Sequence, residues 1–383
     1  MLQPNTKRAV NQFKFAPGPT LSMRLESVEA FPVLLKMGES LRGGSFTYTH
    51  YQAVLVRVNV DGVEGWGEAM TRFDPVATAL LVRYLAKGML DMEFEDVRQP
   101  WDRSWRELRI RGHTRGTDVE ALSGIEIALY DAVGRMTGKP LGSLFSPRPA
   151  RKVPVFAGSL FSSRGPLEDQ VEEAISKGLA GAKVKIGFGA SEDRLTLKTV
   201  RRKWPDGMLV GDANGAYDAR GAAKACEGFA DLGLSWFEEP VLSDDIEGYA
   251  ELKGSPVEIG AGESWFVDDF RLPIEQRLVG VIEPSVSRCG GVGVQIDVAK
   301  KAAKKGISFS PMVGMNSIVS LAASIHSASV CPSVGVEYNP FPNPLQTELG
   351  EGLEKPSRGT IEVPRKPGLG ITVDSRFVKA HSR

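Results

Sequence analysis

The pattern of apolar and polar residues changes character near residue 150. Before it, "HYQAVLVRVNVDGVEGWGEAM" alternates apolar and polar residues around Asp61 and Gly62, which predicts an antiparallel hairpin. Helical spacing follows in "DVEALSGIEIALYDAVGRMTG", which predicts a helix that is capped by Thr117 and ends at Gly138. Residues 23–150 therefore predict an α+β block, and the Pro-rich, basic "SPRPARK" predicts a connector to a second region.

That second region repeats one pattern eight times. Short apolar runs recur, each followed by a polar or charged residue and then by a helix-like stretch. One residue near the end of each run marks the repeat: Gly158, Lys185, Asp212, Glu238, Glu263, Arg288, Met312 and Glu337. Successive markers lie 24 to 27 residues apart (185 − 158 = 27; 312 − 288 = 24). A strand, a helix and two short loops need a step of this size, so residues 151–345 predict a (β/α)₈ barrel of parallel strands.

Composition narrows the classes of partner. The chain has 383 residues, and its Lys plus Arg and Asp plus Glu both number 47, so no basic surplus points to nucleic acid. Apolar runs stay short of the roughly 18 residues of a membrane span. Three widely spaced cysteines indicate reduced thiols, and residues 1–22 lack the apolar core of a signal peptide and predict a poorly ordered arm. We expect a cytoplasmic protein that acts on a small molecule.

Three carboxylates end consecutive barrel strands. Asp212, Glu238 and Glu263 close the third, fourth and fifth apolar runs, and strand ends of a barrel converge on its mouth. Taken alone, each acid is more often a surface ion-pair partner or a helix cap than a ligand. Three in phase indicate a cation between them, and hard oxygen ligands favour Mg²⁺, with Mn²⁺ as a substitute.

The chain resembles the enolase superfamily, in particular its mandelate racemase and muconate lactonizing branch. "EGWGEA" and "GIEIALYDAVGRMTGKPLGSLF" are similar to the family's capping domain, and "KVKIG", "GDANGAYD", "WFEEP", "GAGES" and "RCGG" to successive barrel strand ends. The resemblance implies that the capping domain is discontinuous, with residues 346–383 returning to it, and that the protein is a homo-oligomer, a dimer or an octamer.

The same resemblance implies roles for individual residues. Asp212, Glu238 and Glu263 are the expected Mg²⁺ ligands, and Lys183 and Lys185 form the expected K-x-K pair, with Lys185 nearest the substrate. Removal of the proton next to a carboxylate creates a doubly charged enediolate, which a divalent ion stabilises; this pairing of a Lys base with Mg²⁺ is established for the superfamily. A base must be neutral, and we expect Lys183 and the metal to lower the pKa of Lys185. The alternative interpretation of "KVK" is a strand with solvated lysines.

The opposite face of the substrate departs from the family pattern. Where the racemase group has a His and an Asp, this sequence has Met312 and Ser285, neither of which is a base at neutral pH. Where the lactonizing group has a Lys, it has Arg288, which stays charged and is suited to bind a carboxylate or to stabilise the enediolate. Of the four histidines none falls at a barrel strand end, and His326 is expected to be structural.

A single catalytic face favours elimination of water over racemisation. Lys185 can take the α-proton and return it to the leaving hydroxyl, or Tyr217 or Lys183 can serve as that acid. The function favoured is therefore a sugar-acid dehydratase, a Mg²⁺-dependent lyase that forms a 2-keto-3-deoxy acid. A racemase, epimerase or cycloisomerase is the alternative, and a non-catalytic barrel that binds metal and carboxylate is a third hypothesis.

Polar residues around the mouth are the candidates for substrate binding. The segment "MGESLRGGSFTYTHY", residues 37–51, reads as a flexible lid or as a partly disordered loop, and its polar side chains favour a hydroxylated substrate. Glu337 is expected to bind the substrate carboxylate or to pair with Arg288. The predicted substrate-binding set is Arg42, Tyr48, His50, Asn214, Tyr217, Glu337 and Asn339.

Overall fold

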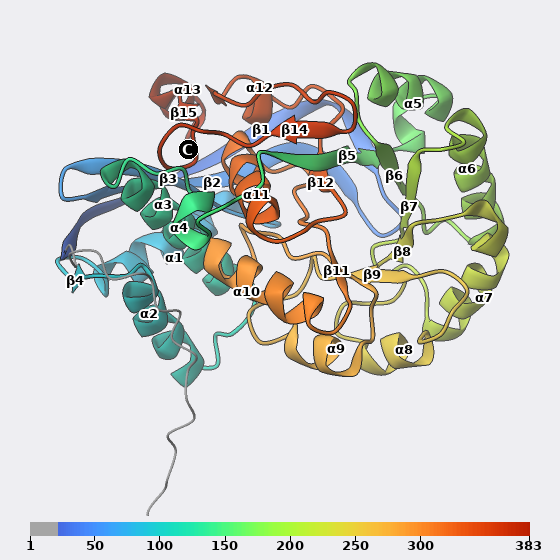
Figure 1. Cartoon of the computed structure of the whole chain (residues 1–383), viewed down its shortest axis with the longest axis horizontal. Coiled ribbons are helices and arrows are strands. Elements are labelled where there is room, and N and C mark those ends of the chain that lie inside the picture. Colours follow the sequence, from blue (N-terminus) through green and yellow to red (C-terminus); the bar gives the residue numbers. More distant parts are fainter. Residues whose placement is uncertain (1–21) are drawn as a thin grey trace, which may run out of the picture.

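The computed structural model describes residues 22–383, so almost all of the expected N-terminal arm lies outside the described residues. Figure 1 shows two regions side by side, a sheet covered by helices and a ring of strands and helices. The first contains the residues before 150, and the second the residues that follow them.

The capping sheet is antiparallel. Its strands are β1 (Met23–Arg42), β2 (Thr47–Val60), β3 (Val63–Ala69) and β4 (Glu93–Phe94), in the order β3-β2-β1-β4. The predicted hairpin is confirmed: β2 and β3 join through Asp61 and Gly62, whose φ values of 46° and 80° are those of a tight turn.

Helices cover one face of this sheet. α1 (Pro75–Lys87) and α3 (Thr117–Met136) pack on the sheet, whereas α2 (Arg98–Ile110) packs on α3, and α4 (Gly142–Phe145) packs on a later helix of the barrel. β3 approaches α3 so closely that a Cβ at Gly67 would lie 2.0 Å from the carbonyl oxygen of Gly124, so the glycine is required there. The predicted helix is present, but Thr117 is its first residue and Gly116 its N-cap, because Gly116 (φ 71°) adopts a backbone that suits glycine.

The eight predicted barrel strands are all present and parallel. They are β5 (Lys152–Leu160), β6 (Gly181–Lys185), β7 (Met208–Asp212), β8 (Trp236–Glu238), β9 (Ile259–Ala261), β10 (Val281–Ile282), β11 (Ser308–Phe309) and β12 (Val336–Tyr338). Each pairs with the next from β5 to β11, and β12 pairs with β5. Between β11 and β12 the amide of Val334 donates to the carbonyl of Phe309 at 2.9 Å, so the ring closes without a regular ladder there.

Helices alternate with these strands around the outside of the ring (Figure 1). They are α5 (Leu167–Ser176), α6 (Ala190–Lys203), α7 (Ala219–Phe229), α8 (Ile246–Glu251), α9 (Arg271–Gln276), α10 (Val292–Ala303), α11 (Ile318–Val330) and the single turn α12 (Pro344–Thr347), with 3₁₀ turns η1 (Ser162–Arg164) and η2 (Ala230–Leu232). In residues 22–383 none of the helices is long and apolar enough to cross a membrane.

The C-terminal segment contacts both regions. It contains β13 (Gly350–Glu351), β14 (Thr360–Glu362), β15 (Thr372–Val373) and α13 (Ser375–His381). β14 pairs antiparallel with the start of β5, whereas the residues after α13 reach β1, where the amide of Arg383 donates to the carbonyl of Pro32 at 2.9 Å. Figure 1 shows α13 beside the capping sheet.

Two buried carboxylates of the capping region bind the N-termini of barrel helices. Glu126 of α3 accepts hydrogen bonds from the amides of Val292 and Gly293 at 2.7 Å each, at the start of α10. Glu68 of β3 accepts from the amide and hydroxyl of Ser317 and from the amide of Ser320, at the start of α11. Helix N-termini carry unpaired amides, so these contacts fix the two regions together.

Candidate active site

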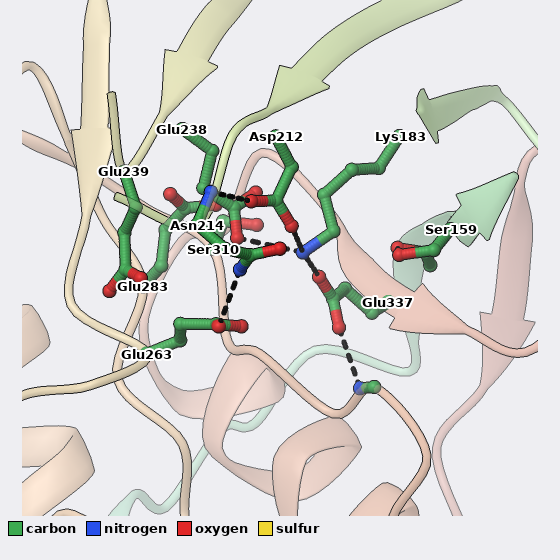
Figure 2. A network of polar contacts seen from close by, with 12 residues as sticks. Ser159, Lys183, Asp212, Asn214, Glu238, Glu239, Glu263, Glu283, Ser310 and Glu337 are labelled. Carbon is green, nitrogen blue, oxygen red and sulfur yellow. Dashed lines mark hydrogen bonds and ion pairs between the residues drawn. The ribbon is translucent and has the colours of Figure 1, made fainter. Parts of the chain in front are cut away.

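Three carboxylates meet at the ends of neighbouring strands. Asp212 and Glu238 are the last residues of β7 and β8, and Glu263 lies two residues beyond the end of β9. One oxygen from each lies within 4.8 Å of the others. All three side chains are buried, Glu263 with 6% exposed and the other two with none. Figure 2 shows them pointing toward a common centre.

Lys183 is surrounded by carboxylates. Its Nζ lies 2.7 Å from Glu238 and 3.3 Å from Asp212, and it also pairs with Glu337 of β12. Burial opposes its charge, but these neighbours raise the pKa of Lys183 well above its usual range. Glu337 also accepts from the amides of Val313 and Gly314 at 3.0 and 2.6 Å, so the suggested pair between Glu337 and Arg288 is absent (Figure 2).

Lys185 faces the cavity from the end of β6. Its Nζ donates to Asp212 and, at 2.8 Å, to the Oδ1 of Asn214, whose Nδ2 donates to Glu263 at 3.0 Å. Burial lowers the pKa of Lys185, and so does the repulsion of Lys183, but the charges of Asp212, Tyr48 and Glu263 together outweigh both, so its pKa is raised. Lys183 thus acts in the expected direction, but the expected net lowering of the pKa is wrong for the chain without a metal, because the negative neighbours outweigh the second amine.

The donor set fits a hard divalent cation. Carboxylate oxygens are the ligands that Mg²⁺ prefers, and three of them converge here in a buried place. One oxygen of Glu238 is buried and has no hydrogen-bond partner among the described residues, which leaves a buried acceptor for a ligand. The two lysines neutralise part of the charge and leave this oxygen unpaired.

A cavity of about 560 Å³ opens above the carboxylates. Residues from both regions line it, among them the predicted site residues Tyr48, His50, Lys183, Lys185, Asn214, Glu263, Arg288 and Asn339. The cavity thus brings the candidate base, one carboxylate of the triad and the predicted polar rim into one space.

Three predicted substrate-binding residues, Arg42, Tyr217 and Glu337, do not line this cavity. Tyr217 donates its hydroxyl to Asp193, and burial together with that hydrogen bond raises its pKa, so it is not placed to protonate a leaving group. Arg42 lies at the exposed end of β1 with its guanidinium 5.4 Å from the ring centre of Phe188. Tyr217 was predicted because it is close to Asp212 in the sequence, and Arg42 because it belongs to the predicted lid. The directions of their side chains exclude both from the cavity lining.

The segment predicted as a lid is mostly a hairpin. Residues 37–42 belong to β1 and 47–51 to β2, which leaves a short loop at 43–46. Its tip rests on the barrel: the hydroxyl of Ser45 donates to the carbonyl of Asn214 at 2.9 Å, and Phe46 lies 5.7 Å from the Nζ of Lys185. The expected disordered loop is therefore wrong, because the strand pairing resumes after an irregularity, with Leu41 opposite Tyr48 and Arg42 opposite Thr47 at the tip.

No histidine occupies the face opposite Lys185 at the barrel strand ends. Ser285 and Met312 form a parallel bridge there, and the thioether of Met312 lines the cavity. His113 pairs with Asp118 at the surface. His326 is buried, accepts from the amide of Gly142 at 3.2 Å and is structural as predicted.

The sequence singled out Arg288 but not two charged residues near it, Arg72 and Glu120. Arg288 lies in the loop after β10, which ends at Ile282, and its partner is Glu120 of α3, with 3.4 Å between Nε and Oε1. Arg72, which follows β3, also lines the cavity. Neither Arg72 nor Glu120 belongs to the barrel repeat, so no spacing could have indicated them.

Two further acids lie beside the triad. Glu239 accepts from the amide of Ser264 at 3.2 Å, and Glu283 accepts from the indole of Trp236 at 3.0 Å. Burial, together with the charges of neighbouring carboxylates, raises the pKa of both, for Glu239 to about 8. Both follow barrel strands in "WFEEP" and "VIEP", a signal that the sequence offered.

The fold and site define a class: (β/α)₈-barrel proteins with a capping domain and a carboxylate cluster suited to a divalent metal. Residues 42–145 match the family model of the mandelate racemase / muconate lactonizing enzyme N-terminal domain, and residues 166–377 match that of the enolase C-terminal domain-like family. The chain therefore belongs to the mandelate racemase and muconate lactonizing branch of the enolase superfamily.

Characterised relatives include isomerases and lyases. The chain is 28% identical to the D-galactarolactone cycloisomerase of Agrobacterium fabrum, over 92% of this chain and 97% of the relative. It is 26% identical to the arabinonate dehydratase of Saccharolobus solfataricus, over 82% and 86%. Among solved structures, an enolase superfamily member from Polaromonas sp. JS666 matches with a TM-score of 0.86 and 26% identity, over 94% and 98%. A racemase from Streptomyces coelicolor A3(2) with bound magnesium matches equally in fold (TM-score 0.86, 23% identity, 94% and 100%).

Proposed function

We propose that the protein is a Mg²⁺-dependent dehydratase that removes water from a sugar acid and forms a 2-keto-3-deoxy acid. The observation that carries this proposal is the arrangement of Lys185 beside the carboxylate triad, with Ser285 and Met312, neither of them a base at neutral pH, at the opposite strand ends. Asp212, Glu238 and Glu263 would hold the metal. The convergence of their oxygens and the magnesium bound to the related racemase support this assignment. When bound, Mg²⁺ supplies positive charge that stabilises the enediolate and offsets the negative charge around Lys185.

Lys185 is placed to move the α-proton. Its Nζ points into the cavity and is held by Asp212 and Asn214, so its direction is fixed before a substrate binds. Lys183 is engaged by three carboxylates and is better suited to keep the triad in place than to donate to a leaving group. The same amine of Lys185 would then return the proton to the departing hydroxyl on the same face.

The opposite face is suited to hold the substrate and exclude water. Met312 presents a thioether and Ser285 a neutral hydroxyl, which lies 3.3 Å from that of Ser287. Exchange between enantiomers needs a base on each face, whereas elimination on one face does not. The homo-oligomer and the cytoplasmic location expected from the sequence stay predictions.

A cycloisomerase is the second candidate, because the galactarolactone cycloisomerase matches over nearly its whole length. Elimination of a ring oxygen uses the same α-proton transfer by Lys185 but releases no water. Product mass separates the two reactions, since an isomerase product has the mass of its substrate.

A screen of aldonic acids, aldaric acids and their lactones with Mg²⁺ tests the proposal. We expect a 2-keto acid, detected as its semicarbazone, from wild type and from Lys224→Ala, which changes an exposed lysine of α7, and none from Lys185→Ala. Exchange of the α-proton with solvent and no keto acid would refute dehydration and favour a racemase or epimerase.

A further inference from the structure

One wall of the cavity carries positive charge that its neighbours only partly neutralise. Arg72, from the segment after β3, and Arg288, from the loop before α10, both line the cavity. They come from the capping region and the barrel and lie within electrostatic range of each other. Two guanidinium groups repel one another unless anions lie between or beside them.

Arg72 has few partners of its own. Its Nη1 donates to the hydroxyl of Tyr48 at 3.4 Å, and its guanidinium lies 6.0 Å from the centre of that ring. Within residues 22–383 no carboxylate lies within ion-pair distance of it. Most of the five N–H donors of this guanidinium thus remain available on the cavity side.

Arg288 is held but not saturated. Glu120, with a side chain only 4% exposed, lies 3.4 Å from its Nε, yet that Nε makes no hydrogen bond to any described residue. Its guanidinium packs 4.9 Å above the ring of Phe266. The planar group is therefore fixed in position with donors unused.

The acids near this wall do not neutralise both arginines. Glu120 is within electrostatic range of Arg72 as well as Arg288, and among the described residues it is the one carboxylate within ion-pair distance of either guanidinium, that of Arg288. Glu239 lies within electrostatic range of Arg288, and Glu263 within range of both arginines, but neither acid forms an ion pair with them. Glu263 belongs to the triad and is bound by Asn214.

We propose that Arg72 and Arg288 bind a second carboxylate of the substrate, so that the enzyme acts on a dicarboxylic sugar acid (an aldaric acid) in preference to a monocarboxylic one (an aldonic acid). This inference rests on the proposed function for the position of the first carboxylate, at the triad. A carboxylate at the far end of the chain accepts paired hydrogen bonds from guanidinium groups and supplies the missing negative charge. The hydroxymethyl end of an aldonic acid supplies neither the paired hydrogen bonds nor the negative charge. A site that is built to bind a polar group discriminates strongly against a ligand that lacks it.

Matched acids that differ only at this end test the proposal. Galactarate and galactonate, and glucarate and gluconate, share each carbon chain but end in a carboxylate or a hydroxymethyl group. With Mg²⁺ we expect the diacid of the preferred pair to have a kcat/KM about 10- to 100-fold higher, the range of a charge-assisted paired contact. Equal constants within every reactive pair, or a preference for the monoacid, would overturn the inference.

Substitution of Arg72 assigns the preference to this wall. In Arg72→Met the ratio of diacid to monoacid kcat/KM should approach one, mainly through a higher KM for the diacid, and Arg72→Lys should keep part of it. Arg106→Met, which changes an exposed arginine of α2, should retain the full ratio. A loss of activity that is equal for both acids would mean that Arg72 is only structural, and would refute its proposed role.

Binding without turnover separates this inference from the proposed function. Lys185→Ala with Mg²⁺ can be titrated calorimetrically with both acids of each pair. Tighter binding of the diacid that is lost in Lys185→Ala/Arg72→Met supports the inference even if wild type forms no keto acid. Equal binding of both acids refutes it even if wild type proves to be a dehydratase.

Discussion

Lys183 and Lys185 lie two residues apart on β6, yet their surroundings differ. Lys183 is held by Glu238, Asp212 and Glu337, whereas Lys185 is held by Asp212 and faces the cavity. The sequence predicted the strand and the common face of the pair, and the catalytic role of Lys185 stays a prediction. It did not predict the contacts of Lys183, because Glu337 comes from a strand about 150 residues later and its side-chain direction is set by tertiary packing.

The buried side chain of His326 should make the free energy of unfolding depend on pH. Burial lowers its pKa from 6.5 to about 4, so the folded state disfavours the charged ring. Its stabilising effect is complete above pH 6.5 and is lost as the pH falls toward 4, by at most about 3 kcal/mol. We expect His326→Gln to remove this part of the dependence between pH 7.5 and 5, measured by urea unfolding.

The exposed His381 of α13 supplies the control for that measurement. His381→Gln should keep the dependence of wild type on pH. An unchanged dependence in His326→Gln would show that other groups cause the loss of stability in acid.

At the scale of elements, hydrophobic periodicity located all eight barrel strands because each is buried and bounded by turn residues. Strand ends were less certain: β10 ends at Ile282, so Arg288 lies in a loop and not on the strand that its spacing suggested. The contributions of the capping region, Arg72 and Glu120, were beyond prediction because no repeat relates them to the barrel. The lid was predicted in position but not in its paired conformation.

The tip of the β1–β2 hairpin should be sensitive to one methyl group. A Cβ at Gly44 would lie 2.7 Å from the carbonyl of Ile186, so Gly44→Ala must push the tip, with Phe46, away from the mouth. We expect kcat/KM to fall about 10- to 100-fold in that variant. Gly38→Ala in the same hairpin meets nothing within 4 Å and should have the activity of wild type; equal constants for all three proteins would show that the tip has no role.

The contact of β3 with α11 should stabilise the joined regions. Glu68→Ala leaves the amides of Ser317 and Ser320 without their acceptor in a buried place, and we expect it to lower the free energy of unfolding by about 2–4 kcal/mol. Glu64→Ala, on the same strand but 57% exposed, should change it by less than about 0.5 kcal/mol. Denaturant unfolding compares the two, and similar values would contradict a role for Glu68 in docking.

At the scale of the whole molecule, the site exists only where the two regions meet. The barrel supplies the triad and both lysines, and the capping region supplies Tyr48, His50 and Arg72. Buried contacts by Glu68 and Glu126 hold the regions in register. Under the two proposals above, proton transfer depends on the barrel, whereas substrate choice depends on Arg72 of the capping region and on Arg288 of the barrel.

Metal binding should stabilise the whole chain through the triad. A ligand at about 100 times its Kd adds about 2.7 kcal/mol to stability, so Mg²⁺ should raise the unfolding temperature and a chelator should reverse the rise. Asp212→Asn and Glu238→Gln should abolish that rise, and Asp206→Asn, at an exposed acid, should keep it. A rise of equal size in all variants would place the metal elsewhere.

Proton NMR in D₂O follows the proposed reaction in a sugar acid incubated with the protein and Mg²⁺. We predict that the α-proton is lost, that a 2-keto-3-deoxy acid with one solvent deuterium at C3 forms, and that Lys185→Ala stops both events. Proton loss that continues in Lys185→Ala, or keto acid that forms without Mg²⁺, would contradict this prediction.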